Sequence, residues 1–153
     1  MDSIPSFSVN HLNLKQGLYL AYSLPLSFHS INAFDVRLKV PYTTTISPEA
    51  MHSLEHGFAT IARNSNYRDK VVAVTPMACL TGMYFILIDV PVSLFSLIFL
   101  SWASQFLELT EVPGATKEQC GNADFQNLEE AKQVVRDFIT VFNENPLTTY
   151  PDE

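Results

Sequence analysis

The sequence is short of several residue types, and each shortage excludes a class of protein. Two cysteines among 153 residues are too few for the disulfide framework of a small secreted domain, and free thiols favour a reducing, cytoplasmic location. Nine Lys and Arg residues against 16 Asp and Glu leave no basic surface for nucleic-acid phosphates. The 47% content of hydrophobic residues is too high for a disordered chain. We therefore expect a single domain over residues 1–153 that does not bind nucleic acid.

Charge is also missing from residues 90–107, which approach the length of a membrane span. A proline and several serines interrupt this stretch, and neither Lys nor Arg flanks it. A buried helix, or a helix hidden in an oligomer contact, explains this composition better than a membrane segment does. We expect no membrane association, although this helix is expected to carry an exposed apolar patch.

The chemically most informative residues form one short motif, His-x-x-Glu-His, at residues 52–56. Two histidines four residues apart lie on one face of a helix, so His52 and His56 can bind the same metal ion. Glu55 lies one residue before the second histidine, where a carboxylate can act as a base at the edge of the metal. The alternative is a helix whose histidines only pack against neighbours or face water.

The residues around this motif predict a helix from Pro48 to Asn64. Ser47 is a good N-cap, Pro48 suits the first helical position, and Glu49 adds negative charge to the first turn. Apolar residues recur at helical spacing along one side: Met51, Leu54, Phe58, Ile61 and Ala62. A catalytic metal usually takes a third protein ligand, and the other Cys and His residues are Cys79, Cys120, His11 and His29.

Five blocks of the sequence, in order and at matching spacing, resemble the S-ribosylhomocysteine lyase (LuxS) family over nearly the whole chain. They are Ser6–His11 (SFSVNH), Phe34–Arg37 (FDVR), Leu54–His56 (LEH), Thr75–Gly82 (TPMACLTG) and Glu118–Gly121 (EQCG). The resemblance implies that one ferrous ion per subunit, replaceable by zinc or cobalt, is bound by His52, His56 and Cys120. The implied general acid/base pair is Glu55 and Cys79. The implied substrate-binding residues are Ser6, His11 and Arg37.

The resemblance also implies a reaction and an assembly. The substrate would be S-ribosylhomocysteine, cleaved to homocysteine and 4,5-dihydroxy-2,3-pentanedione, the precursor of autoinducer-2. Family members are homodimers with each active site at the subunit interface. The residue types suit this chemistry, because carbonyl migration and β-elimination need groups that take and return protons at neutral pH. A thiol such as Cys79 does so when nearby positive charge, from Arg37 or the metal, lowers its pKa.

Several positions depart from the family pattern and leave alternatives open. Ala73 stands where the family has Asp, Ala78 where it has Gly, and Leu80 where it has Gln or Arg. One alternative is a weakly active or non-catalytic relative that binds a related thioether. Another is a metallopeptidase, because His-x-x-Glu-His is also the inverted motif of a group of zinc proteases, although those enzymes are longer and use an acidic third ligand. Taken singly, Cys79 could be a buried apolar residue and Arg37 a solvated strand residue.

The order of the expected elements predicts an α+β fold, a mainly antiparallel sheet with helices packed on one face, similar to a metallohydrolase sandwich. Strands are expected at residues 30–41, 71–74 and 83–90. The residues 10–22 form either a further strand or an irregular arm.

The last third of the chain is expected to contain a loop, a helix and a tail. Residues 110–127 form the loop, marked by Pro113 and Gly114. Asn127 caps the helix, with Glu130 in the capping-box position. The tail, residues 143–153, is expected to be polar and frayed.

Overall fold

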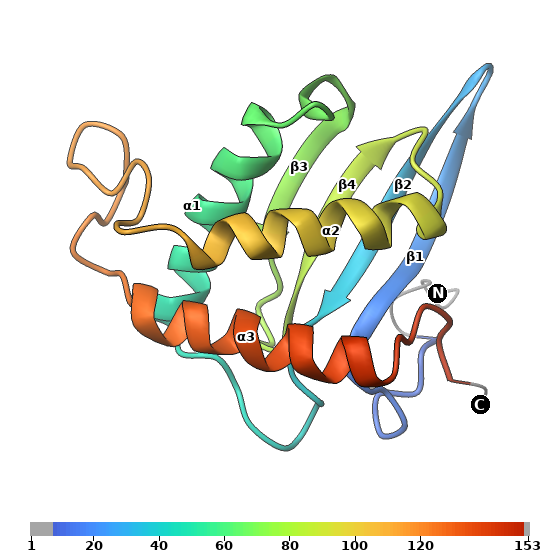
Figure 1. Cartoon of the computed structure of the whole chain (residues 1–153). Coiled ribbons are helices and arrows are strands. Elements are labelled where there is room, and N and C mark those ends of the chain that lie inside the picture. Colours follow the sequence, from blue (N-terminus) through green and yellow to red (C-terminus); the bar gives the residue numbers. More distant parts are fainter. Residues whose placement is uncertain (1–7, 152–153) are drawn as a thin grey trace, which may run out of the picture.

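A computed structural model describes residues 8–151, in which one sheet is covered by three helices (Figure 1). All neighbouring strands are antiparallel in the order β1-β2-β4-β3. The strands are β1 (Gly17–Leu26), β2 (His29–Arg37), β3 (Val71–Pro76) and β4 (Gly82–Ile88). The helices are α1 (Pro48–Asn64), α2 (Val92–Leu107) and α3 (Leu128–Glu144), with a short 3₁₀ turn, η2 (Arg68–Lys70), before β3. The predicted α+β class, with a mainly antiparallel sheet and helices on one face, is confirmed.

Helix α1 begins and ends where the sequence predicts. The Ser47 hydroxyl accepts a hydrogen bond from the Ala50 N–H at 3.1 Å, which satisfies one of the unpaired N–H groups of the first turn. Gly57 allows α2 to cross close to α1, because a Cβ at this position would collide with the ring of Phe106. The turn of α1 that carries His56 is therefore held directly against the core.

The start of α3 is tied to the start of α1. Asn127 caps α3 as predicted, since its side-chain oxygen accepts from the Glu130 N–H at 3.1 Å. The predicted capping box does not close, because the Glu130 carboxylate accepts instead from the Ser47 N–H at 2.9 Å and the Ser47 hydroxyl at 2.6 Å. These two hydrogen bonds lower the pKa of Glu130. One carboxylate thus serves the positive ends of two helices.

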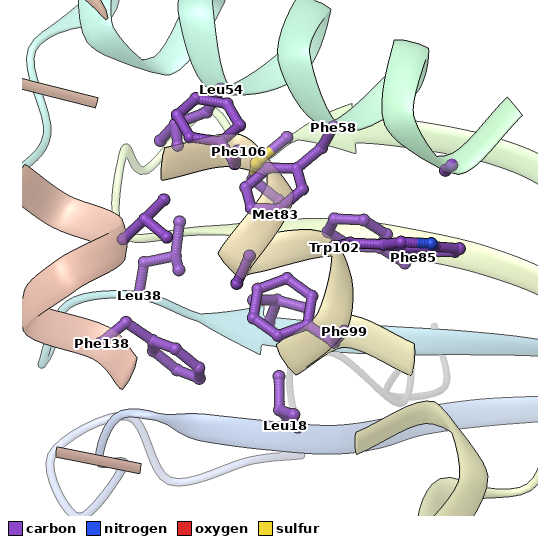
Figure 2. Packing of buried hydrophobic residues seen from close by; sticks show 14 of the residues in the cluster. Leu18, Leu38, Leu54, Phe58, Met83, Phe85, Phe99, Trp102, Phe106 and Phe138 are labelled. Atoms are coloured by element: carbon purple, nitrogen blue, oxygen red, sulfur yellow. The ribbon is translucent and has the colours of Figure 1, made fainter. Parts of the chain in front are cut away.

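The core between the sheet and the helices is rich in aromatic rings (Figure 2). The Phe58 ring stands 4.8 Å from that of Phe106 and 5.5 Å from that of Phe85, measured between centroids. The uncharged stretch of the sequence is α2, whose rings at Phe95, Phe99, Trp102 and Phe106 are at most 1% exposed. Burial of these rings explains why the helix lacks charge.

Helix α2 does not carry the expected exposed patch. Within residues 8–151, Leu97 is its one exposed large hydrophobic side chain. Exposed apolar residues gather instead on the β1–β2 hairpin, at Tyr22, Leu24, Leu26 and Phe28. No helix of the described part of the chain has the length and apolar character needed to cross a membrane.

The second face of the sheet is partly covered around Asp35 and Arg37, which the sequence did not predict. Alternation along β2 predicts that Asp35 and Arg37 face solvent, yet they are only 2% and 3% exposed. The segment after α3 runs along the free edge of β1, where the Leu147 carbonyl accepts from the Leu18 N–H at 2.9 Å, and Tyr150 then covers the Asp35 side of the sheet by stacking on Tyr19. The prediction of a frayed tail is therefore wrong for this segment.

Two strand boundaries also differ from the prediction. Strand β2 ends at Arg37 and not at Pro41, because the N–H groups of Leu38 and Lys39 both donate to the Thr81 carbonyl. Residues 10–22 turn out to contain both of the expected alternatives: residues 10–16 are irregular, and β1 begins at Gly17 and continues to Leu26.

Candidate active site

His52, His56 and Cys120 converge beside the first half of α1. The two imidazole rings come from successive helical turns, and their centroids are 4.7 Å apart in an edge-to-face arrangement. Cys120 comes from the loop between α2 and α3, and its Sγ lies 3.5 Å from Nε2 of His52. The possible ligand atoms of all three residues lie within 4.8 Å of one another, and the side chains are half-buried. Two imidazoles and a thiolate form a donor set suited to zinc or iron.

Backbone carbonyls orient both imidazole rings. Nδ1 of His52 lies 2.8 Å from the Phe125 carbonyl oxygen, and Nδ1 of His56 lies 2.9 Å from that of Pro113. Because a carbonyl can only accept, an Nδ1–H on each ring would donate to it and leave Nε2 with its lone pair for a metal. Nδ1 of His52 also lies 3.1 Å from Nε2 of Gln126, but its contact with the Phe125 carbonyl is the shorter one. Gly114, with φ of +69°, turns the chain directly after Pro113. This arrangement argues against the alternative in which the histidines only pack or face water.

Glu55 lies on α1 directly before His56. Its side chain is half-buried, and it forms no hydrogen bond or ion pair within the described part of the chain. A carboxylate that is not engaged by any of the described residues is available to take and return a proton.

A second cluster surrounds a cavity of about 390 Å³ on the sheet face away from the helices. Its lining residues are Val9, His11, Asp35, Arg37, Pro76, Met77, Ala78, Cys79, Tyr84 and Tyr150. Cys79 lies on the turn between β3 and β4, is exposed, and also borders an adjoining cavity of about 270 Å³. His11 is held at the rim by a 2.8 Å contact between its Nδ1 and the Val9 carbonyl.

A buried chain of polar contacts leads to the Cys79 thiol. Nη2 of Arg37 donates to Oδ2 of Asp35 at 2.7 Å. Nη1 of Arg37 donates to Oγ1 of Thr81 at 2.7 Å and lies 3.6 Å from Sγ of Cys79. The Thr81 hydroxyl is itself 3.2 Å from that sulfur. The alternatives of a solvated Arg37 and a buried, apolar Cys79 are both wrong.

These contacts make the thiol more acidic. Burial raises the pKa of Cys79, but hydrogen bonds from Thr81 and the charge of Arg37 outweigh burial and lower the pKa below its usual value. A thiolate can only accept, so the Thr81 hydroxyl donates to it while accepting from Arg37. A cysteine with a lowered pKa and an exposed sulfur is the kind that reacts and exchanges protons.

The sequence reasoning missed three polar residues of the contacts around Arg37 and Cys79: Asp35, Thr81 and Tyr150. Asp35 could have been found, because residues i and i+2 of a strand share a face and Arg37 was already singled out. Thr81 follows Cys79 by two residues but carries no signal of its own. Tyr150 lies 115 residues from Asp35, and nothing local predicts that its hydroxyl donates to Oδ2 of Asp35 at 3.0 Å.

The two clusters do not line the same cavity among those formed by the described residues. Neither the 390 Å³ cavity nor the adjoining 270 Å³ cavity is lined by His52, His56, Cys120 or Glu55. The structure thus brings together the three expected metal ligands, and separately His11, Arg37 and Cys79. Ser6 lies outside the described residues. His29, without an assigned role, pairs with Asp89 at 2.6 Å on the hairpin.

The unusual residues of the Cys79 turn occupy different surroundings. Ala78 lines the cavity, so the substitution of Gly at this position affects the cavity wall. Leu80 has φ of +58°, packs against the hydrophobic core and is not among the residues that line the cavity. Ala73 lies at a register shift of β3 opposite Ile86 and is not among the cavity residues.

Comparison with known proteins agrees with this arrangement. The family model described as S-ribosylhomocysteinase (LuxS) matches residues 4–148, a range that ends before Tyr150. The S-ribosylhomocysteine lyase of Porphyromonas gingivalis is 35% identical over 161 aligned positions, covering 99% of this chain and 100% of the relative. The enzymes of the same name from Clostridium beijerinckii and Borreliella afzelii are 35% and 31% identical, covering 91% and 94% of this chain and 90% and 94% of their own. The chain therefore belongs to the S-ribosylhomocysteinase (LuxS) family.

Proposed function

We propose that this protein is a metal-dependent lyase that cleaves the thioether of S-ribosylhomocysteine. The products are homocysteine and 4,5-dihydroxy-2,3-pentanedione, the precursor of autoinducer-2. The observation that carries the proposal is the convergence of His52, His56 and Cys120 beside Glu55, a carboxylate without a hydrogen-bond or ion-pair partner among residues 8–151. Relatives with the name of this enzyme match nearly the whole chain, which supports the same assignment.

In this proposal His52, His56 and Cys120 hold one ferrous ion, for which zinc or cobalt can substitute. The fit rests on the two carbonyl-bound Nδ1 atoms, which leave both Nε2 lone pairs available next to the sulfur. When bound, the metal supplies Lewis acidity that makes a C–H beside a sugar carbonyl more acidic.

Cys79 and Glu55 carry protons in the proposed reaction. The lowered pKa of Cys79 provides a thiolate that can take a proton from the carbon beside the carbonyl and return it to the carbonyl carbon. In the same step the proton of the neighbouring hydroxyl passes to the former carbonyl oxygen, which becomes a hydroxyl. Repeating this transfer moves the carbonyl along the ribose. A proton is then removed beside the carbonyl, the carbon–sulfur bond breaks, and homocysteine leaves as a thiolate. Glu55 is the second proton carrier.

Ser6, His11 and Arg37 are the proposed substrate-binding residues. His11 and Arg37 both line the cavity that contains Cys79, which places an imidazole and a guanidinium where sugar hydroxyls could be bound. The Arg37 guanidinium also contacts Cys79 directly, and its charge helps to lower the pKa of that thiol.

The separation of the two clusters supports a homodimer with its active sites at the interface. Among residues 8–151, the metal ligands do not line the cavity that contains Cys79, so the two groups of residues are not brought together around one described cavity. Two copies related by a two-fold axis can bring the metal cluster of one subunit against the Cys79 cavity of its partner. We further propose that residues 1–153 form one domain and that the protein acts in the cytoplasm, where its free Cys79 and Cys120 stay reduced.

Thiol release from S-ribosylhomocysteine by anaerobically purified protein tests the proposal. We expect about one transition-metal ion per chain by elemental analysis, and homocysteine release that follows enzyme concentration. A Cys79→Ala variant should keep its metal and lose turnover by at least about a thousandfold, since a proton carrier is removed. Binding of substrate without thiol release would contradict the lyase and indicate a non-catalytic relative. Casein cleavage would indicate a peptidase.

A further inference from the structure

The buried ion pair of Asp35 and Arg37 leaves one hydrogen-bonding atom of each side chain without a partner among the described residues. The carboxylate and the guanidinium are both buried, yet they share only one short contact, from Nη2 to Oδ2. Oδ1 of Asp35 and Nε of Arg37 have no hydrogen-bond partner in the described part of the chain. A guanidinium and a carboxylate usually prefer a two-point contact, which would satisfy both atoms. Something must therefore hold this pair in its one-point arrangement.

Two contacts with other residues keep Asp35 and Arg37 from forming the two-point contact. The Tyr150 hydroxyl donates to Oδ2 of Asp35 at 3.0 Å, and Oγ1 of Thr81 accepts from Nη1 of Arg37 at 2.7 Å. Burial, followed by the Asp35 charge and hydrogen bond, raises the pKa of Tyr150, so the phenol stays protonated and donates. The Tyr150 ring is itself fixed by stacking on Tyr19, with centroids 4.6 Å apart.

We propose that Tyr150 is a positioning residue: its hydroxyl holds Asp35 in the one-point contact, which leaves the second arm of Arg37 on Thr81 and Cys79. If the hydroxyl is removed, Asp35 can take both Nη2 and Nε of Arg37, and Nη1 leaves Thr81. The thiolate of Cys79 then loses a cation, and the Thr81 hydroxyl that donates to it is no longer fixed. The inference rests on the proposed function only in that Cys79 is a proton carrier there.

The surroundings of Cys79 contain other titratable groups that a pH experiment must keep constant. Those that line the two adjoining cavities or contact the buried pair are His11, Asp35, Arg37, Tyr19, Tyr42, Tyr84 and Tyr150. A comparison of the wild-type protein with Tyr150→Phe keeps all of them except the one hydroxyl. The phenylalanine ring also keeps the stacking surface on Tyr19.

The test is the rate of Cys79 alkylation by iodoacetamide as a function of pH, without substrate. Tryptic cleavage after Lys117 places Cys79 and Cys120 on different peptides, so mass spectrometry follows each separately. In Tyr150→Phe we expect Cys79 to react about three- to tenfold more slowly at pH 7, with its pH midpoint moved upward. Cys120 should react at the wild-type rate. A Tyr67→Phe variant, altered on the far side of the molecule, should leave both rates unchanged.

A double variant tests whether the effect passes through Arg37. In an Arg37→Gln background the cation is already absent, so Tyr150→Phe should cause no further slowing. An unchanged Cys79 profile in Tyr150→Phe, or equal slowing in both backgrounds, would overturn the proposal. A truncation after Thr149 that slows Cys79 when Tyr150→Phe does not would also overturn it, because ring packing would then be responsible. Alkylation of Cys79 does not require lyase activity. The role of Tyr150 can therefore be tested even if the protein proves not to be a lyase.

Discussion

The metal cluster and the Cys79 cavity are built in opposite ways. The metal cluster takes two of its three residues from adjacent turns of one helix, and short-range rules place them together. The cavity draws its polar residues from β2, the β3–β4 turn and the segment after α3. The first can be recognised from spacing, whereas the second exists only once the chain has folded.

The two regions also differ in how their charges are supported. The histidines depend on neutral backbone carbonyls at Phe125 and Pro113, which orient them without adding charge. Cys79 depends on a buried ion pair, which is costly to form and costly to break. A substitution in the ion pair beside Cys79 should therefore lower mainly the free energy of unfolding. A substitution that disturbs the support of the histidines should lower mainly the metal affinity.

The largest stability effect is expected from breaking the buried pair. Asp35→Asn removes the charge opposite Arg37, where both side chains are 3% exposed, and should lower the free energy of unfolding by about 3–5 kcal/mol. Urea denaturation measures this change. Asp69→Asn is the matched control, because Asp69 pairs with Arg68 at 3.8 Å on the surface and should cost at most about 0.5 kcal/mol. An equal loss of unfolding free energy in the two variants would contradict the expectation that the buried ion pair matters more for stability than the exposed one.

A smaller stability effect with a selective loss of metal is expected at the loop beside His56. Gly114→Ala forces an alanine into a left-handed backbone and should cost about 1–2 kcal/mol. The shifted Pro113 carbonyl would release the His56 ring, so metal affinity should fall about ten- to a hundredfold in a competition titration with a chelator. Gly121→Ala is the control, since a Cβ there meets no atom within 4 Å. Wild-type metal affinity in Gly114→Ala would mean that the carbonyl does not orient the ligand.

The parts of the fold that could be predicted are those set by local chemistry. Helix α1 extends from Pro48 to Asn64 as its cap and apolar spacing indicate, and Asn127 caps α3. Strands β3 and β4 lie within two residues of the expected ranges. The α+β class follows from the order of these elements.

The parts that could not be predicted depend on contacts between distant residues. Glu130 leaves its own helix to bind Ser47, 83 residues away, because two helix ends meet there. Tyr150 lies in a polar, proline-containing segment that resembles a frayed tail, yet stacking on Tyr19 and the hydrogen bond to Asp35 hold it on the sheet. No local pattern in the sequence distinguishes a docked tail from a mobile one.

The most direct test of the central claim, that one subunit's metal cluster works with its partner's cavity, uses two inactive variants. His56→Ala damages only the metal cluster, and Cys79→Ala damages only the cavity. The two are co-expressed with different affinity tags, and the mixed dimer is isolated by sequential purification. If each active site combines both subunits, one site of the mixed dimer carries both defects and the other carries none. Thiol release should then recover to about half of the wild-type rate per dimer. A mixed dimer as inactive as its parents, or failure to isolate any mixed dimer, would contradict the claim.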